Sequence, residues 1–97
     1  KAVLAAEELN INAVVGNILS SDTFYNDDQD ANDLWRKMNV LCVEMEAAAL
    51  YMNAARAGKK ALCILTISDH VYTGEALSAE DRQSTFHDMM KIALEIA

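Results

Sequence analysis

One stretch constrains the fold more than any other: an apolar run that ends abruptly in polar residues. Ala61-Leu62-Cys63-Ile64-Leu65 leads into Thr66-Ile67-Ser68-Asp69-His70. A short, continuous apolar run is typical of a strand that is buried on both faces. Open α/β sheets bind their ligands at the carboxyl ends of such strands. The stretch therefore predicts a buried strand over residues 61–68 that carries Asp69 to the rim of a sheet.

The rest of the chain alternates between helical and strand-like segments. The patterns predict helices over 1–9, 31–38, 47–57 and 79–97, and strands over 11–19, 40–43 and 61–68. Apolar strands that alternate with helices favour an α/β fold whose sheet faces are covered by helices. No linker or internal repeat divides the sequence, so we expect a single unit.

Local signals mark the ends of these helices. The first is expected to stop near Asn10, Gly58 is expected just past the third, and Asp30 and Ser78 are candidate N-caps. The last helix is expected to turn an apolar face inward, formed by Phe86, Met89, Met90, Ala93 and Ile96.

Composition excludes several classes of function. The chain has 97 residues, is 53% hydrophobic and carries a net charge of −7. Its basic residues are scattered, so we expect no nucleic-acid partner. No apolar run reaches the roughly 18 residues of a membrane span, and no signal peptide is present. Cys42 and Cys63 lie in apolar runs and are expected to be reduced, which favours the cytoplasm.

The acidic loop over residues 26–30 raises the question of a metal site. It lacks the glycine and the final glutamate of a calcium-binding loop at their positions. We therefore expect no metal site and no cofactor.

Three polar clusters follow the ends of the predicted strands. They are Phe24-Tyr25, Glu44-Met45-Glu46 and Ser68-Asp69. Because parallel strands end at the same edge of a sheet, the three clusters are expected to converge on one pocket. The alternative is that the carboxylates are helix caps, and Glu46 suits that role because it precedes an alanine-rich helix.

The residues of these clusters also resemble the sequence motifs of a known protein family. Val43-Glu44-Met45-Glu46-Ala47-Ala48, Ser68-Asp69-His70 and Arg82-Gln83-Ser84-Thr85-Phe86 resemble the C-terminal part of the hexameric, bacterial-type (DeoD-type) purine nucleoside phosphorylases. Ser21-Asp22-Thr23-Phe24-Tyr25 is similar to the base-stacking segment of that family. The resemblance covers essentially the whole chain and implies part of a three-layer α/β/α fold with a mixed central sheet.

The resemblance implies a reaction: the reversible phosphorolysis of purine (2′-deoxy)ribonucleosides to a free base and (deoxy)ribose 1-phosphate. Asp69 would be the general acid toward purine N7, which requires burial that raises its pKa from the ordinary value of roughly 4. Arg82 would stabilise the carboxylate left after proton transfer. It would approach as the last helix adjusts around bound phosphate.

The remaining candidates would bind the substrate, as the resemblance implies. Glu46 would take the ribose hydroxyls, Met45 would pack on the sugar, and Glu44 would border the ribose and the base. Phe24 would stack on the purine, Val43 would close its other side, and Ser68 would hydrogen-bond near N7. For Phe24 and Met45 the alternative is ordinary core packing. His70 is expected to be structural.

The phosphate half of the family's site is missing from the sequence. No glycine-rich phosphate loop can be drawn from Gly16, Gly58 and Gly74, and the three arginines are Arg36, Arg56 and Arg82. The chain also opens on Lys1 in a helical composition. We therefore expect a C-terminal portion of one domain, inactive alone, whose N-terminal phosphate-binding portion lies elsewhere.

The family also implies a homo-oligomer, a hexamer built as a trimer of dimers, with a role in purine salvage. Three other readings stay open. A purine nucleosidase of the same superfamily would use water in place of phosphate, although His70 and Arg82 argue against it. A non-catalytic nucleoside-binding or assembly module is the second, and a purely structural fragment is the third and simplest.

Overall fold

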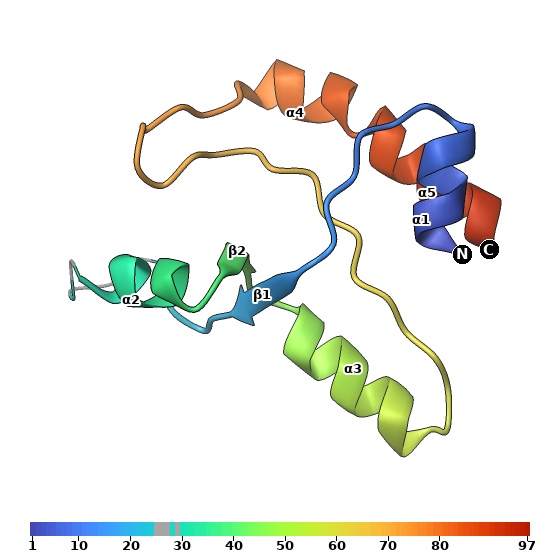
Figure 1. Cartoon of the computed structure of the whole chain (residues 1–97), viewed down its shortest axis with the longest axis horizontal. Coiled ribbons are helices and arrows are strands. Elements are labelled where there is room, and N and C mark those ends of the chain that lie inside the picture. The colour runs from blue at the N-terminus through green and yellow to red at the C-terminus, as the bar shows by residue number, and fades with distance from the viewer. Residues whose placement is uncertain (25–27, 29) are drawn as a thin grey trace. The chain divides into compact units, whose positions relative to one another are not determined.

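The computed structural model describes residues 1–24, 28 and 30–97, and only the backbone of residues 83–85. Along the chain the elements are α1 (Ala2–Glu8), β1 (Asn17–Ser20), α2 (Ala31–Lys37), β2 (Val40–Glu44), α3 (Ala47–Arg56), α4 (Ala79–Thr85) and α5 (His87–Ile96), drawn in Figure 1. They form two compact units: Lys1–Val14 with Ile64–Ala97, and Val15–Cys63. The helices and the small parallel sheet agree with the expected α/β class.

The unit of residues 15–63 is built on a β–α–β arrangement. β1 and β2 pair in parallel, with Ser20 opposite Glu44, and α2 connects them (Figure 1). The predicted strand over 11–19 is too long, because the pairing with β2 begins only at Asn17. The two strands end together, so their C-terminal polar residues share one edge, as predicted for this pair.

The helices α1 and α3 end where the sequence predicts, and each is followed by a left-handed residue. After α1, Asn10 has a φ of 56°, and the amide of Ile11 donates to the carbonyl of Ala6 at 2.8 Å. After α3, Gly58 has a φ of 65° and the amide of Lys59 donates to the carbonyl of Ala54 at 2.8 Å. This hydrogen bond is the one that closes a helix in the Schellman motif.

The unit that contains both ends of the chain has its core between α1 and α5. Ala5 and Ala6 of α1 bury against Ile92 of α5, and Ile11, Ile64 and Ile96 pack around them. The predicted inward face of the last helix was partly wrong, since Ile92 is the buried residue and Met90 is 51% exposed. Small alanine side chains on α1 let α5 approach along the stripe of Ile92 and Ile96.

The predicted strand over residues 61–68 is not formed. The segment runs without a paired strand, and Leu62 and Ile67 are 52% and 60% exposed. A strand is stabilised only by a hydrogen-bonded neighbour, and none lies beside this segment among the residues that the structure describes. An apolar run indicates burial, but it does not supply the partner.

The predicted single helix over 79–97 is two helices. Phe86 is both the C-cap of α4 and the N-cap of α5, with a ψ near zero (φ −77°, ψ −4°). The sequence from 84 to 88 consists of weaker helix formers than Arg82 and Gln83 before it, which favours a break within this stretch. At the start of α4 the predicted cap is present, because the Ser78 hydroxyl accepts from the Asp81 amide at 3.0 Å. Asp30 precedes α2 but makes no side-chain cap.

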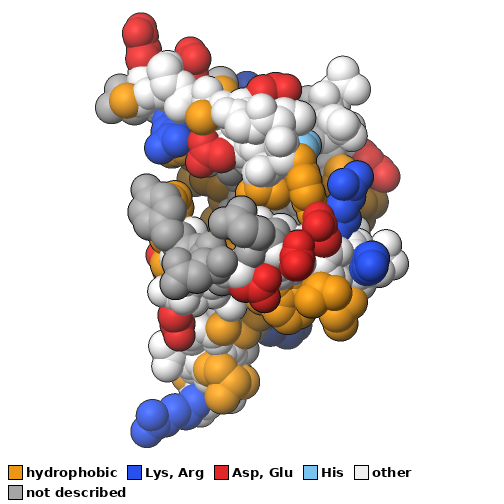
Figure 2. Space-filling view, turned by 90° about the vertical axis from the view of Figure 1, so that its left-hand side faces the viewer, with side chains coloured by type: hydrophobic (Ala, Val, Ile, Leu, Met, Phe, Trp, Pro, Cys, Tyr) orange, Lys and Arg blue, Asp and Glu red, His pale blue; other side chains and the backbone are white. Residues whose placement is uncertain are grey.

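Many large hydrophobic side chains lie at the surface, and some are visible in Figure 2. Val14, Val15 and Leu94 are each more than three-quarters exposed. Within the described ranges, no helix has the length and apolarity needed to cross a membrane.

Candidate functional site

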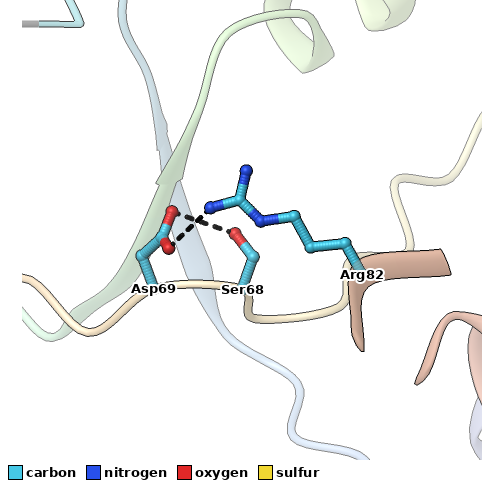
Figure 3. Close-up of polar contacts among 3 residues, drawn as sticks. All are labelled: Ser68, Asp69 and Arg82. Atoms are coloured by element: carbon cyan, nitrogen blue, oxygen red, sulfur yellow. Dashed lines mark hydrogen bonds and ion pairs between the residues drawn. The ribbon is translucent and has the colours of Figure 1, made fainter. Parts of the chain in front are cut away.

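Asp69 and Arg82 meet in the unit that holds both chain ends. Arg82 projects from α4, and its Nη2 donates to Asp69 Oδ1 at 3.0 Å; the Ser68 hydroxyl donates to Asp69 Oδ2 at 3.2 Å (Figure 3). Both oxygens of the carboxylate are therefore engaged, one by a cation and one by a hydroxyl. The arrangement stabilises negative charge on Asp69.

The loop after Asp69 is closed by its own hydrogen bonds. Asp69 forms an antiparallel bridge with Ala76, and the Leu77 amide donates to the Ser68 carbonyl at 2.8 Å. Inside the loop, His70 Nδ1 accepts from the amides of Tyr72 and Thr73, each at 3.2 Å. The imidazole thus acts as a local cap, which fits the structural role expected for His70.

Asp69 is not buried in the described chain. Its side chain is 45% exposed and that of Arg82 is 46% exposed. The burial expected for a general acid is therefore wrong for the chain as it stands. The acid also follows an extended segment rather than a paired strand.

A second polar cluster lies at the shared end of β1 and β2. The Ser20 hydroxyl donates to Glu44 Oε1, and Glu44 Oε2 accepts from the amides of Glu46 and Ala47, each at 2.6 Å. Ser20 Oγ also accepts from the Ala48 amide at 3.0 Å. We call these contacts the Ser20–Glu44 clamp. The hydrogen bond from Ser20, followed by those from the two amides, lowers the pKa of Glu44 despite some desolvation.

The side chain that caps α3 is that of Glu44 and not that of Glu46. Glu46 stands at the N-cap position, but its side chain makes no capping hydrogen bond. Glu44 accepts the helix amides instead. The interpretation of Glu46 as a helix cap is therefore wrong, and its exposed carboxylate lies outside the clamp.

Three apolar candidates of the same unit are exposed. Phe24 is 73%, Val43 48% and Met45 41% exposed. Ordinary core packing therefore does not explain Phe24 or Met45 in the described chain. Tyr25, which follows Phe24 in the quoted motif, lies outside the described residues, as do Asn26, Asp27 and Gln29 of the acidic loop.

The structure thus brings together two sets of predicted residues. One is Ser68, Asp69 and Arg82, and the other is the strand end that carries Val43 to Glu46. Sequence reasoning missed Ser20, which lies one residue beyond the strand predicted over 11–19. Its signal was its position: a serine at the end of one strand faces the end of the next parallel strand.

The two cysteines are free thiols, as expected, and both are half-buried. Burial, reinforced by the nearby Cys63 and Glu44, raises the pKa of Cys42, and burial also raises that of Cys63. Among residues 1–24, 28 and 30–97 there is no group of three or more His, Cys, Asp or Glu side chains that could hold a metal ion.

Comparison with known sequences identifies relatives along the whole chain. The model of the phosphorylase superfamily matches residues 1–97. The DeoD-type purine nucleoside phosphorylases of Caldanaerobacter subterraneus subsp. tengcongensis and Thermoanaerobacter pseudethanolicus are each 60% identical over 97 residues, which is 100% of this chain and 42% of each relative. That of Psychromonas ingrahamii is 56% identical over 95 residues, 98% of this chain and 40% of the relative.

The chain spans about two fifths of the length of these curated relatives. The match nevertheless extends over the whole chain and includes both polar clusters. The chain belongs to the phosphorylase superfamily.

Proposed function

We propose that the complete protein carrying this chain is a purine nucleoside phosphorylase, which reversibly cleaves purine (2′-deoxy)ribonucleosides with phosphate. The observation that carries the proposal is the contact of 3.0 Å between Asp69 and Arg82. It is supported by relatives that are named DeoD-type purine nucleoside phosphorylases. When Asp69 is protonated it can give its proton to a leaving base, and the neighbouring guanidinium can stabilise the carboxylate that remains.

In this mechanism Asp69 begins as a neutral acid and gives its proton to purine N7. Protonation makes the base a better leaving group as the sugar becomes cationic. A purine seated on Asp69 would exclude water from the exposed carboxyl. The ion pair with Arg82 would then form or strengthen as the proton leaves, so its stabilisation is greatest late in the reaction.

The other candidates would bind the nucleoside. The free carboxylate of Glu46 suits the paired 2′- and 3′-hydroxyls of ribose, and Met45 next to it offers an apolar surface to the sugar. Phe24 would stack on the base, Val43 would border it, and Ser68 would hydrogen-bond near N7. Glu44 was expected at the border of the ribose and the base.

The proposal includes the parts that this chain does not supply. Phosphate is a co-substrate, and its binding loop would belong to an N-terminal portion of the same domain, so that residues 1–97 form the C-terminal portion. The mixed central sheet of a three-layer α/β/α fold would then pair with the segment over 61–68. The complete protein would act in the cytoplasm in purine salvage, as a homo-oligomer, a hexamer of the trimer-of-dimers type, without a metal, cofactor or nucleic acid.

The test is phosphate dependence in the complete protein. We expect inosine to be converted to hypoxanthine and ribose 1-phosphate only when phosphate is present. Asp69→Asn should lower kcat by roughly 10²–10⁴-fold, the usual contribution of a general acid, with a smaller effect on substrate affinity. Release of free ribose without phosphate would instead identify a nucleosidase. Binding of inosine without any turnover would identify a non-catalytic module.

A further inference from the structure

The Ser20–Glu44 clamp joins three elements at one point. Ser20 ends β1, Glu44 ends β2, and the amides they bind belong to Glu46, Ala47 and Ala48 at the start of α3. The first amides of a helix have no partner within the helix, so an unsatisfied start would fray. Here two side chains satisfy three consecutive amides, and a hydrogen bond between those side chains ties them together.

This geometry fixes the backbone on both sides of Met45. The Glu44 side chain bends forward over the turn to reach the amides two and three residues ahead. The Ser21 amide donates to the Glu44 carbonyl at 2.9 Å, which anchors the same residue from the side of β1. Met45 and Glu46 therefore lie in a turn with a fixed start and a fixed end.

The clamp also leaves Glu44 poorly suited to bind a sugar hydroxyl. One of its oxygens receives the Ser20 hydroxyl and the other receives two amides. Its negative charge is balanced by the positive end of the α3 dipole. Glu46 is the opposite case, because its side chain is exposed and makes no cap.

We propose that Glu44 and Ser20 are positioning residues, which hold the Met45–Glu46 turn so that the Glu46 carboxylate is aimed at the ribose hydroxyls. Glu44 itself does not touch the substrate. This inference rests on the proposed function for the role of Glu46, whereas the clamp itself stands on the observed contacts. The two glutamates, only two residues apart, thus have different roles: Glu44 positions the turn and Glu46 binds the ribose.

The test compares variants of the complete protein on two substrates. Inosine offers both ribose hydroxyls, and 2′,3′-dideoxyinosine offers neither. We expect Glu44→Gln and Ser20→Ala to lower kcat/KM for inosine by roughly 10–100-fold, the scale for a misplaced positioning group, with much less effect on the dideoxy substrate. Ser20→Thr keeps the hydroxyl, so its kcat/KM for inosine should stay close to that of the parent protein. Glu95→Gln, an exposed glutamate on α5, is the control and should leave both rates unchanged.

A double-mutant comparison separates positioning from direct contact. If Glu44 acts through Glu46, then Glu44→Gln should cause no further loss on inosine once Glu46→Gln is present. Additive losses, or a change in the preference between inosine and adenosine without a change in ribose discrimination, would show that Glu44 contacts the substrate and would overturn the proposal.

Amide hydrogen exchange tests the clamp without any activity. In Glu44→Gln and Ser20→Ala, the amides of Glu46, Ala47 and Ala48 should exchange faster than in the parent protein, whereas those of α5 should not. Faster exchange with unchanged ribose discrimination would keep the clamp but reject its role in positioning. Unchanged exchange at all three amides would reject the clamp. If the complete protein cleaves no nucleoside at all, the proposed function fails while the exchange result still decides the clamp.

Discussion

Arg82 places its Nη2 3.0 Å from Oδ1 of Asp69, across 13 residues of sequence. The loop between them is held by the bridge of Asp69 with Ala76 and by the Ser78 cap of α4. The acid and its cation are therefore joined by a short, internally bonded segment. Any movement of α4 relative to that loop would change the distance between their charges.

The first prediction concerns Arg82. Arg82→Gln removes the positive charge that faces Asp69 and should lower kcat for phosphorolysis in the complete protein. Because both side chains are nearly half exposed, the pair adds only about 0–1 kcal/mol to folding, so thermal stability should hardly change.

Steady-state kinetics and thermal unfolding of the same variant check this pair of outcomes. Lys91→Gln is a matched control, since Lys91 pairs with Asp88 on the surface of α5 at 3.9 Å. A large loss of stability with unchanged kcat in Arg82→Gln would contradict the prediction.

The second prediction concerns the acceptor on His70. Its Nδ1 receives two amides, and the Oδ1 of asparagine can occupy the same position, whereas the amide group of glutamine is placed one carbon farther out. His70→Asn should therefore keep the loop closed and retain most activity. His70→Ala should lose about 0.5–1.5 kcal/mol of stability for each hydrogen bond removed, less where the loop is solvated.

Hydrogen exchange at the Tyr72 and Thr73 amides, measured beside activity, checks this ranking. If His70→Asn is as inactive as His70→Ala while the loop amides remain protected, the imidazole takes part in the chemistry rather than in the loop.

The third prediction concerns acid sensitivity. The clamp lowers the pKa of Glu44 from its ordinary value of 4.5, mainly through the hydrogen bond from Ser20. A depressed pKa means that the unfolded chain binds the proton more readily. The contribution to stability is thus complete above about pH 4.5 and is lost as the pH falls through the lower pKa of the folded state.

Glu44→Gln should remove this part of the acid dependence, so the free energy of unfolding should fall less steeply below pH 4.5 than in the parent. Urea unfolding at a series of pH values measures the slope. Glu95→Gln should leave it unchanged. An identical slope in Glu44→Gln would mean that the clamp does not favour the charged carboxylate.

The fourth prediction concerns the thiols. Burial raises the pKa of Cys42 and of Cys63, and each is raised further by nearby negative groups, among them Glu44. Because the thiolate is the reactive form, both cysteines should be alkylated by iodoacetamide at pH 8 more slowly than in the urea-unfolded chain. Mass spectrometry of timed samples gives both rates. Equal rates in folded and unfolded protein would contradict the prediction.

Local signals in the sequence predicted the ends of elements well. Asn10 and Gly58 adopt the left-handed conformation that ends a helix, and Ser78 caps α4. These features depend on a few neighbouring residues, which is why they can be read locally. The sequence also predicted that Asp69 and Arg82 act as a pair, although that inference came from a family resemblance and their roles stay predictions.

Other predictions failed where the local structure depends on contacts with distant parts of the chain. The apolar run over 61–68 indicated a strand, but a strand needs a hydrogen-bonded neighbour that composition cannot provide. The expected burial of Asp69 depended on the same missing neighbour. The break at Phe86 was hidden because the apolar period continues through it, although the helix does not.

The sequence by itself determined the class of fold, the ends of α1 and α3, the start of α4 and the candidate residues, because these follow from hydrophobic period, turn chemistry and short motifs. Only the tertiary structure decided how the two glutamates differ. Glu44 and Glu46 are the same residue type two positions apart, and either could have capped α3. The parallel pairing of β1 with β2 sets Ser20 opposite Glu44. Glu44 therefore accepts hydrogen bonds from the Ser20 hydroxyl and from the first amides of α3, whereas the carboxylate of Glu46 lies outside the clamp.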